Sequence, residues 1–337
     1  MQGKKIDKEK LRVALNRFVE KQNQIVYGYG KNGIFITHKI YTDHVEDLSL
    51  FNPYFGINGA TFFYRVFSKD IKVVMLLRPC EIRAMIELVK LNQIEPETIT
   101  MISTDCPGTV SLKKAKADLP DDFLEIQKAA EKDDGGLRWA CKFCREKRGV
   151  FGDAGIRVQE DGGMWIFPYT DKGSDFLNLI DEELVEYTGK FVILESMKTE
   201  PFVTDMDTFH KDFSKCILCK NCRDMCPVCY CVDCLFNGDE YLPKGDAFIN
   251  KMLRTGTENL PYGKEIFHMI RMYHVSQTCV GCGACEEACP QDIPITKYFK
   301  GISERLQNLF SYMSGRDVKE TIPYLTFKED ELKDTED

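Results

Sequence analysis

Residues 216–227 read C-I-L-C-K-N-C-R-D-M-C-P, and residues 279–290 repeat the pattern as C-V-G-C-G-A-C-E-E-A-C-P. Both blocks have the spacing C-x2-C-x2-C-x3-C-P. In this spacing three thiolates of one tight loop hold a 4Fe-4S cluster, while the fourth cysteine ligates the other cluster. We therefore predict two clusters whose ligands cross between the blocks. The first set is Cys216, Cys219, Cys222 and Cys289, and the second set is Cys279, Cys282, Cys285 and Cys226.

A structural zinc site is the alternative interpretation of these cysteines, since zinc also binds C-x2-C pairs. Zinc needs four ligands per metal and no trailing cysteine–proline pair, so two complete copies favour iron–sulfur clusters. Gly281 and Gly283 lie inside the second block. Glycine lets the main chain approach closely, so we expect their amides to donate hydrogen bonds to the second cluster.

The composition is that of a globular protein with about two domains. The chain has 337 residues, 43% of them hydrophobic and 29% charged. A net charge of −8 argues against nucleic acid as a partner, because phosphate binding needs a basic surface. The chain has fifteen cysteines, and its N-terminus is polar, unlike a secretory signal. Since a reducing compartment disfavours disulfides, we expect these cysteines to be metal ligands. The longest apolar run, residues 73–77, is far shorter than a membrane span, and we expect a cytoplasmic chain.

The N-terminal part has the pattern of an α/β (α+β) domain with a short parallel sheet. Residues 8–19 have helical spacing, and residues 72–77 and 98–103 are strand-like runs on either side of a helical stretch at 81–91. Strand, helix and strand predict a parallel crossover. Cys80 and Cys106 then lie at the carboxyl ends of two parallel strands, where open α/β sheets bind ligands.

A C-x2-C pair at Cys141 and Cys144 completes four thiolates with Cys80 and Cys106. These four cysteines, the third set, are enough for a third 4Fe-4S cluster. The alternative is that Cys80 and Cys106 are small buried hydrophobes and that the pair is unmetallated or redox-active. Spacing alone leaves both open. Four arginines near ligand cysteines either offset cluster charge or form surface salt bridges: Arg78, Arg83, Arg145 and Arg223.

Two features suggest nucleotide binding without matching it well. Residues 28–33 fit G-x-G-x-x-G, but a strand-like run follows instead of a helix, so we predict a hairpin through Asn32 and Gly33. The aromatic residues between 51 and 67 would shield a flavin or pack in a half-buried sheet, and the second role is commoner. The five histidines are scattered and predict surface or core roles: His38, His44, His210, His268 and His274.

The remaining pattern divides the chain at residues 198–213, where periodicity is lost. Before this point we predict a strand at 164–167, a helix at 174–187 capped by Ser174, and a strand at 191–194. After it, helical stretches at 246–253, 262–275 and 294–313 predict an all-helical two-cluster ferredoxin-like domain. The expected domains are 1–204, 205–315 and an acidic tail at 316–337. Three further thiols shield a cluster or coordinate metal: Cys229, Cys231 and Cys234.

Residues 77–84 (L-R-P-C-E-I-R-A), 216–231 and 278–291 resemble the beta subunit of soluble sulfhydrogenases and the corresponding iron–sulfur chain of anaerobic sulfite reductase. Those proteins are iron–sulfur electron-transfer subunits that sit between two others, one carrying flavin and one catalytic. The resemblance therefore implies that partner subunits supply a flavin and a catalytic metal centre.

A second resemblance runs through residues 78–80, 105–108, 141–144 and 152–155. These segments are similar to the beta subunit of deazaflavin-reducing hydrogenases and formate dehydrogenases. The resemblance implies a 4Fe-4S cluster on the third set, beside FAD. That family's Gly-, Ala- and Leu-rich flavin-binding helix has no counterpart near this N-terminus, which argues against FAD. Such subunits also occur with heterodisulfide-reductase-like proteins.

Three functional hypotheses follow. The leading one is an electron-transfer subunit of a multi-subunit anaerobic oxidoreductase, such as a hydrogenase, a formate dehydrogenase or a heterodisulfide-reductase-like complex, without a substrate site of its own. The second is a flavoenzyme that exchanges hydride with a deazaflavin or nicotinamide. In the third, the clusters are structural parts of a binding module.

Overall fold

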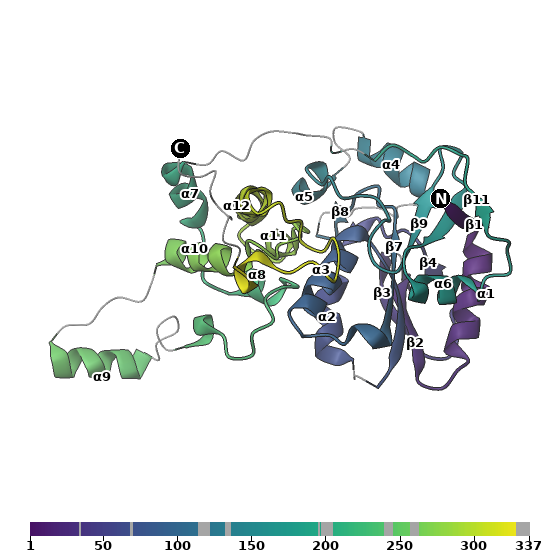
Figure 1. Cartoon of the computed structure of the whole chain (residues 1–337). Helices are drawn as coiled ribbons and strands as arrows, with labels where there is room; N and C mark the ends of the chain where they lie inside the picture. The colour runs from purple at the N-terminus through teal and green to yellow at the C-terminus, as the bar shows by residue number, and fades with distance from the viewer. Residues whose placement is uncertain are drawn as a thin grey trace.

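The computed structural model describes residues 1–33, 35–67, 70–113, 122–131, 136–194, 196, 205–238, 245–256 and 263–327. An α/β domain occupies the N-terminal part, and a group of helices from the C-terminal part lies beside it (Figure 1). A mixed α/β domain followed by a helical domain confirms the coarse prediction of fold class. Helix α9 (Gly245–Thr255) extends away from the rest.

The described residues of the N-terminal part form a nine-stranded mixed sheet in the order β11-β1-β10-β9-β7-β6-β2-β3, with β4 paired to β2. The four central strands β9, β7, β6 and β2 run parallel, and the outer pairs are antiparallel. The predicted short parallel sheet is thus the centre of a larger sheet. The strands are β1 (Gln2–Ile6), β2 (Gln24–Asn32), β3 (Phe35–Tyr41), β4 (Leu48–Ser49), β6 (Lys72–Leu77), β7 (Ile99–Thr104), β9 (Ala154–Val158), β10 (Met164–Pro168) and β11 (Val185–Glu186).

Helices cover both faces of this sheet (Figure 1). On one face lie α1 (Lys8–Val19), α4 (Phe123–Glu131) and α6 (Asp171–Leu177), and on the other lie α2 (Gly59–Val66) and α3 (Pro79–Lys90). The sequence of strand β6 is continuously apolar because both faces of the strand are covered. Val74 and Leu76 pack on the first face, and Met75 and Leu77 pack on the second, because side chains alternate along a strand.

The hairpin prediction is confirmed. Strands β2 and β3 pair antiparallel up to Asn32 and Phe35, and Gly33 between them has φ of +62°. A left-handed backbone at this position suits glycine and a tight turn. Since β3 follows, the G-x-G-x-x-G segment does not open a helix and is not a dinucleotide loop.

Three local predictions are wrong. Phe62, Phe63 and Tyr64 lie on α2 rather than in a sheet. The helix expected at 174–187 begins at Asp171, is capped by the Thr170 side chain and ends at Leu177; residues 185–186 form β11. The run at 191–194 contributes only one isolated bridge, from Phe191 to Gln159. In each case tertiary packing overrides a weak local preference.

The described residues after 204 form helices and short 3-10 turns. The helices predicted at 246–253, 262–275 and 294–313 correspond to α9, α10 and α12, the last of which ends at Leu309. The expected boundary at 204 and the acidic end at 328–337 lie outside the described residues. The helices are α7 (Met206–Phe213), α8 (Asn221–Asp224), α9, α10 (Lys264–Val275), α11 (Ala284–Glu287) and α12 (Ile295–Leu309).

The two domains pack closely. Val280, from the second cysteine block, is buried in the apolar core on the α3 face of the sheet. Arg83 on α3 donates from Nε to the Ser314 carbonyl at 2.9 Å. Ile322 is fully buried in one cluster with Leu91, so the part of the predicted tail around Ile322 packs on the domain, whereas residues 324–327 are exposed. No described helix is long and apolar enough to span a membrane.

Candidate metal centres

The four cysteines of the third set come together at the carboxyl ends of the central strands β6 and β7. Strands β6 and β7 are parallel neighbours, with Leu77 beside Ser103. Cys80 lies in the first turn of α3 after β6, and Cys106 follows β7. The short helix α5 (Trp139–Lys142) brings the C-x2-C pair to the same place. One cavity is lined by all four thiols of the third set, Cys80, Cys106, Cys141 and Cys144.

Arg78 lines the same cavity and is held by a buried network. Its Nε lies 3.2 Å from Oε2 of the fully buried Glu81, and Nη1 donates to the Tyr54 carbonyl at 3.0 Å. The guanidinium also faces the rings of Tyr29 and Phe55. These contacts fix a positive charge beside the third set, in a position where it could offset thiolate charge.

The surroundings shift the pKa values of the third-set thiols in different directions. Burial raises the pKa of Cys106 to about 12, with Arg78 opposing it. The pKa of Cys141 is lowered although burial acts in the other direction, because Arg138 and a 3.1 Å contact with Thr109 Oγ1 favour the thiolate. Cys141 is therefore the member of this set that loses its proton most readily in the metal-free chain.

The fourth cysteine of each sequence block lies near thiols of the other block. Burial raises the pKa of Cys222 to about 11; Arg271 opposes this, and the nearby thiols of Cys216, Cys289 and Cys219 add to it. Cys289 thus lies with the thiols of the first block. Cys226 in turn lies close enough to Cys285 of the second block for each to disfavour a charge on the other. The two blocks therefore lie close together, and the crossed ligation that the spacing predicts stays a prediction.

Main-chain amides converge on the sulfur atoms with a repeated spacing of two residues. The Leu218 amide donates to Cys216 Sγ at 3.3 Å. Corresponding amide bonds lower the pKa of four further thiols against the larger effect of burial, in the pairs Gly108 to Cys106, Glu146 to Cys144, Gly281 to Cys279 and Ala284 to Cys282. Loops of this kind favour anionic sulfur.

The residues with a left-handed backbone occupy equivalent positions in the two cysteine blocks. Gly281 and Gly283 have φ of +68° and +74°, and Leu218 and Lys220, at equivalent places in the first block, have φ of +54° and +64°. The two loops therefore share one backbone shape. Glycine is used in the second block alone, where the other domain lies against the loop.

The three sets of cysteines lie one after another in space. Cys282 of the second set lines the cavity of the third set. Helices α8 and α11, which carry Cys222 and Cys285, pack against each other. The order is therefore third set, second set, first set, and each set is adjacent to the next.

The other predicted residues have varied surroundings. Cys229 is hydrogen-bonded to Cys226 and packs in the helical core, Cys234 is half-buried and Cys231 is exposed. Arg223 forms an ion pair with Asp224, and Arg145 is exposed. Arg83 bonds the Val280 carbonyl and the Ser314 side chain, which places it as a support of the second block.

Sequence reasoning missed three polar residues that face the cysteines. His268 Nε2 lies 3.4 Å from Cys216 Sγ, and Arg271 Nη1 donates to Cys222 Sγ at 3.0 Å. Both interrupt the apolar face of α10, which is the signal that could have identified them. Arg138 had no such signal, because it precedes a helix of only four residues.

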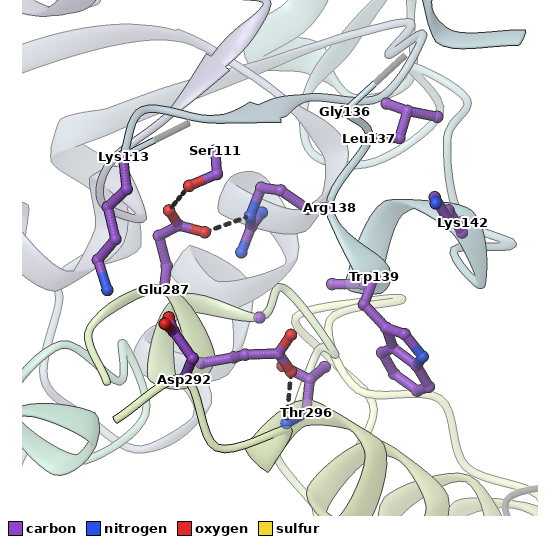
Figure 2. A pocket seen from close by; sticks show the side chains of 13 residues that line it. Ser111, Lys113, Gly136, Leu137, Arg138, Trp139, Lys142, Glu287, Asp292 and Thr296 are labelled. Carbon is purple, nitrogen blue, oxygen red and sulfur yellow. Dashed lines mark hydrogen bonds and ion pairs between the residues drawn. The ribbon is translucent and has the colours of Figure 1, made fainter. Parts of the chain in front are cut away.

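Arg138 joins the two domains beside the third set. Figure 2 shows Glu287, from the second block, between Ser111 and Arg138 of the N-terminal domain. A second guanidinium nitrogen of Arg138 donates to the Cys282 carbonyl at 3.0 Å. The contact lies in an open cavity of about 300 Å³ that is also lined by Lys113, Trp139 and Asp292.

The donor chemistry of each set fits a 4Fe-4S cluster: four thiols, amides directed at sulfur, and buried guanidinium groups nearby. Within the described ranges, no three His, Cys, Asp or Glu side chains are arranged to hold a single metal ion. All fifteen cysteines are free of disulfides.

An α/β domain and a helical domain with cysteines so placed define the class of iron–sulfur proteins. Residues 212–293 match the 4Fe-4S dicluster domain family. The chain is 26% identical over 299 residues to F420-dependent formate dehydrogenase subunit beta of Methanocaldococcus jannaschii, covering 74% of this chain and 75% of that protein. It is 27% identical over 302 residues to F420-dependent formate dehydrogenase 1 subunit beta of Methanococcus maripaludis, covering 74% of each. The resemblance to deazaflavin-linked formate dehydrogenase beta subunits is thereby confirmed.

Proposed function

We propose that this chain relays single electrons through three 4Fe-4S clusters, held by the third, second and first sets in that order. The observation that carries the proposal is the adjacency of the sets, with Cys282 lining the cavity of the third set. When bound, such clusters take up and release one electron at a time. A chain of neighbouring sites is the arrangement that transport between two partners requires.

The residues around the sets hold the thiols ready for metal. Backbone amides two residues beyond a cysteine favour its thiolate, as Gly281 does for Cys279. Arg78 and Arg138 supply positive charge at the third set, and Arg271 does so between the first and second sets. Most of the cysteines in the three sets are half-buried, which limits the water around their sulfur atoms and strengthens these interactions.

The partners we propose are two further subunits, one containing flavin and one catalytic with its own metal centre. The relatives are named as beta subunits of F420-dependent formate dehydrogenases, so a formate dehydrogenase complex is the first candidate. Hydrogenase and heterodisulfide-reductase-like complexes are the other candidates. Isolation of the native complex through an untagged partner would identify the reaction, because the neighbour's cofactor defines it.

Iron and flavin analysis of the protein purified without oxygen tests the proposal. We expect about 12 irons per chain and no stoichiometric flavin. Cys106→Ser should reduce the iron to about eight, since it removes one ligand of the third set. Colourless protein, or protein that carries only zinc, would refute the relay.

A second candidate is a flavoprotein that binds FAD and oxidises a deazaflavin itself. The names of the relatives favour it, whereas the missing flavin-binding helix argues against it. One FAD per chain that is reduced by a deazaflavin faster than the clusters would favour the flavoenzyme over the relay.

A further inference from the structure

Arg271 is a wholly buried cation at the first set. It lies on α10 with 1% of its surface exposed. Its Nη1 donates to Cys222 Sγ and its Nη2 donates to the Cys222 carbonyl, both at 3.0 Å. The guanidinium is also held over the Phe299 ring, 4.8 Å from the centroid. These contacts fix both the position and the orientation of the charge.

Sulfur atoms of the ligand cysteines supply the negative charge that Arg271 faces once they bind metal. Among the described residues, no aspartate or glutamate forms an ion pair with it. The sulfur atom that accepts its hydrogen bond is that of Cys222, which becomes a thiolate when it binds metal. A guanidinium removed from water needs a nearby anion, because an uncompensated buried charge is strongly unfavourable. The cysteine sulfurs are positioned to be that anion.

His268 adds a second contact from the same helix. It precedes Arg271 by three residues, so both side chains lie on the same face of α10. Its Nε2 is 3.4 Å from Cys216 Sγ, and its ring packs on Phe213 with centroids 4.1 Å apart. Helix α10 therefore presents nitrogen atoms to two cysteines of the first set.

We propose that Arg271, assisted by His268, raises the reduction potential of the cluster held by the first set. This inference rests on the proposed relay. Reduction adds one negative charge to a thiolate-ligated cluster, and a fixed cation with hydrogen bonds to sulfur stabilises the reduced form more than the oxidised form. The second set should respond less, because Arg271 makes no direct hydrogen bond to its sulfur atoms that matches the one to Cys222.

Redox titration of the protein under anaerobic conditions, followed by EPR, tests the inference. The signal lost in Cys219→Ser identifies the first-set cluster. In Arg271→Gln we expect at least a tenfold fall in the equilibrium constant for its reduction, which is 59 mV for one electron. Arg271→Lys keeps the charge without the planar fork and should lower the potential by less. The matched control is Arg305→Gln, since Arg305 is exposed on α12, and its potentials should equal those of the wild type.

The outcomes separate this inference from the relay. Wild-type protein without 4Fe-4S signals would refute the relay itself. Wild-type signals together with an unchanged first-set potential in an iron-replete Arg271→Gln variant would refute the role of Arg271 alone. If Arg271→Gln does not incorporate its clusters, the first-set potential of Arg271→Lys tests the role of Arg271 in the same way. If neither loads, His268→Gln decides, because an unaltered first-set potential there would contradict the contribution of α10.

Discussion

Arg138 Nε lies 3.1 Å from Glu287 Oε2, and this ion pair connects the loop before α5 to the second cysteine block. The side chains are only 5% and 10% exposed. Because Arg138 also touches the cavity of the third set, the pair ties the domain interface to two candidate metal centres. Its loss should loosen both.

Glu287→Ala should destabilise the protein by about 3 kcal/mol, since it leaves the Arg138 guanidinium buried without its carboxylate. Glu287→Gln keeps hydrogen-bonding capacity and should cost less. Loss of visible absorbance in urea under anaerobic conditions measures both. Glu9→Ala, which removes an exposed pair with Arg12 on α1, is the control and should behave as the wild type. Equal effects of the three changes would contradict a structural role for the pair.

Gly283→Ala and Gly281→Ala form a matched pair, because both glycines have a left-handed backbone. That backbone alone costs an alanine about 1–2 kcal/mol. At Gly283 a Cβ would also lie 2.6 Å from Ala140 Cβ, whereas at Gly281 the nearest atom is a flexible Lys300 carbon at 3.4 Å. We expect Gly283→Ala to cost about 1–3 kcal/mol more. Thermal unfolding of the two variants compares them, and similar midpoints would argue against the close approach of α5.

Cys226→Ser and Cys289→Ser test the exchange of fourth ligands between the blocks. Cys226→Ser should damage the second-set cluster, and Cys289→Ser should damage the first-set cluster, each with a loss of up to four irons per chain. EPR spectra of the reduced variants distinguish the two signals. Loss confined to the first-set signal in Cys226→Ser would show that each block keeps its own fourth cysteine.

Tyr169 should make the stability of the folded protein sensitive to alkaline pH. Burial raises the pKa of Tyr169 to about 12, above the value near 10 in an unfolded chain. The folded state therefore holds this proton more tightly, and its contribution to stability is complete below pH 10 and declines as the pH rises toward 12. Between pH 9 and pH 11 the wild type should lose about 1 kcal/mol more than Tyr169→Phe. Parallel loss in the two proteins, measured by urea unfolding, would contradict the raised pKa.

Local sequence was enough to predict several elements. The apolar runs at 72–77 and 98–103 form β6 and β7, and helical periodicity at 8–19 and 262–275 marks α1 and α10. Prediction failed where a segment was short or irregular. Thr170 caps α6 four residues before the expected start, and Phe191 only bridges to Gln159. In such segments packing against neighbours outweighs local preference.

The sequence by itself determined the ligand chemistry of this protein. The spacing from Cys216 to Cys222 and from Cys279 to Cys285 is a local property, because a tight loop of fixed length brings those sulfur atoms together wherever it occurs. Tertiary structure alone decided which charges face the sulfurs and how the three sets follow one another. Arg138 and Arg271 reach Cys282 and Cys222 across gaps of 144 and 49 residues. Contacts over such separations depend on how helices pack within a domain and how the two domains pack together, and no local pattern encodes that packing.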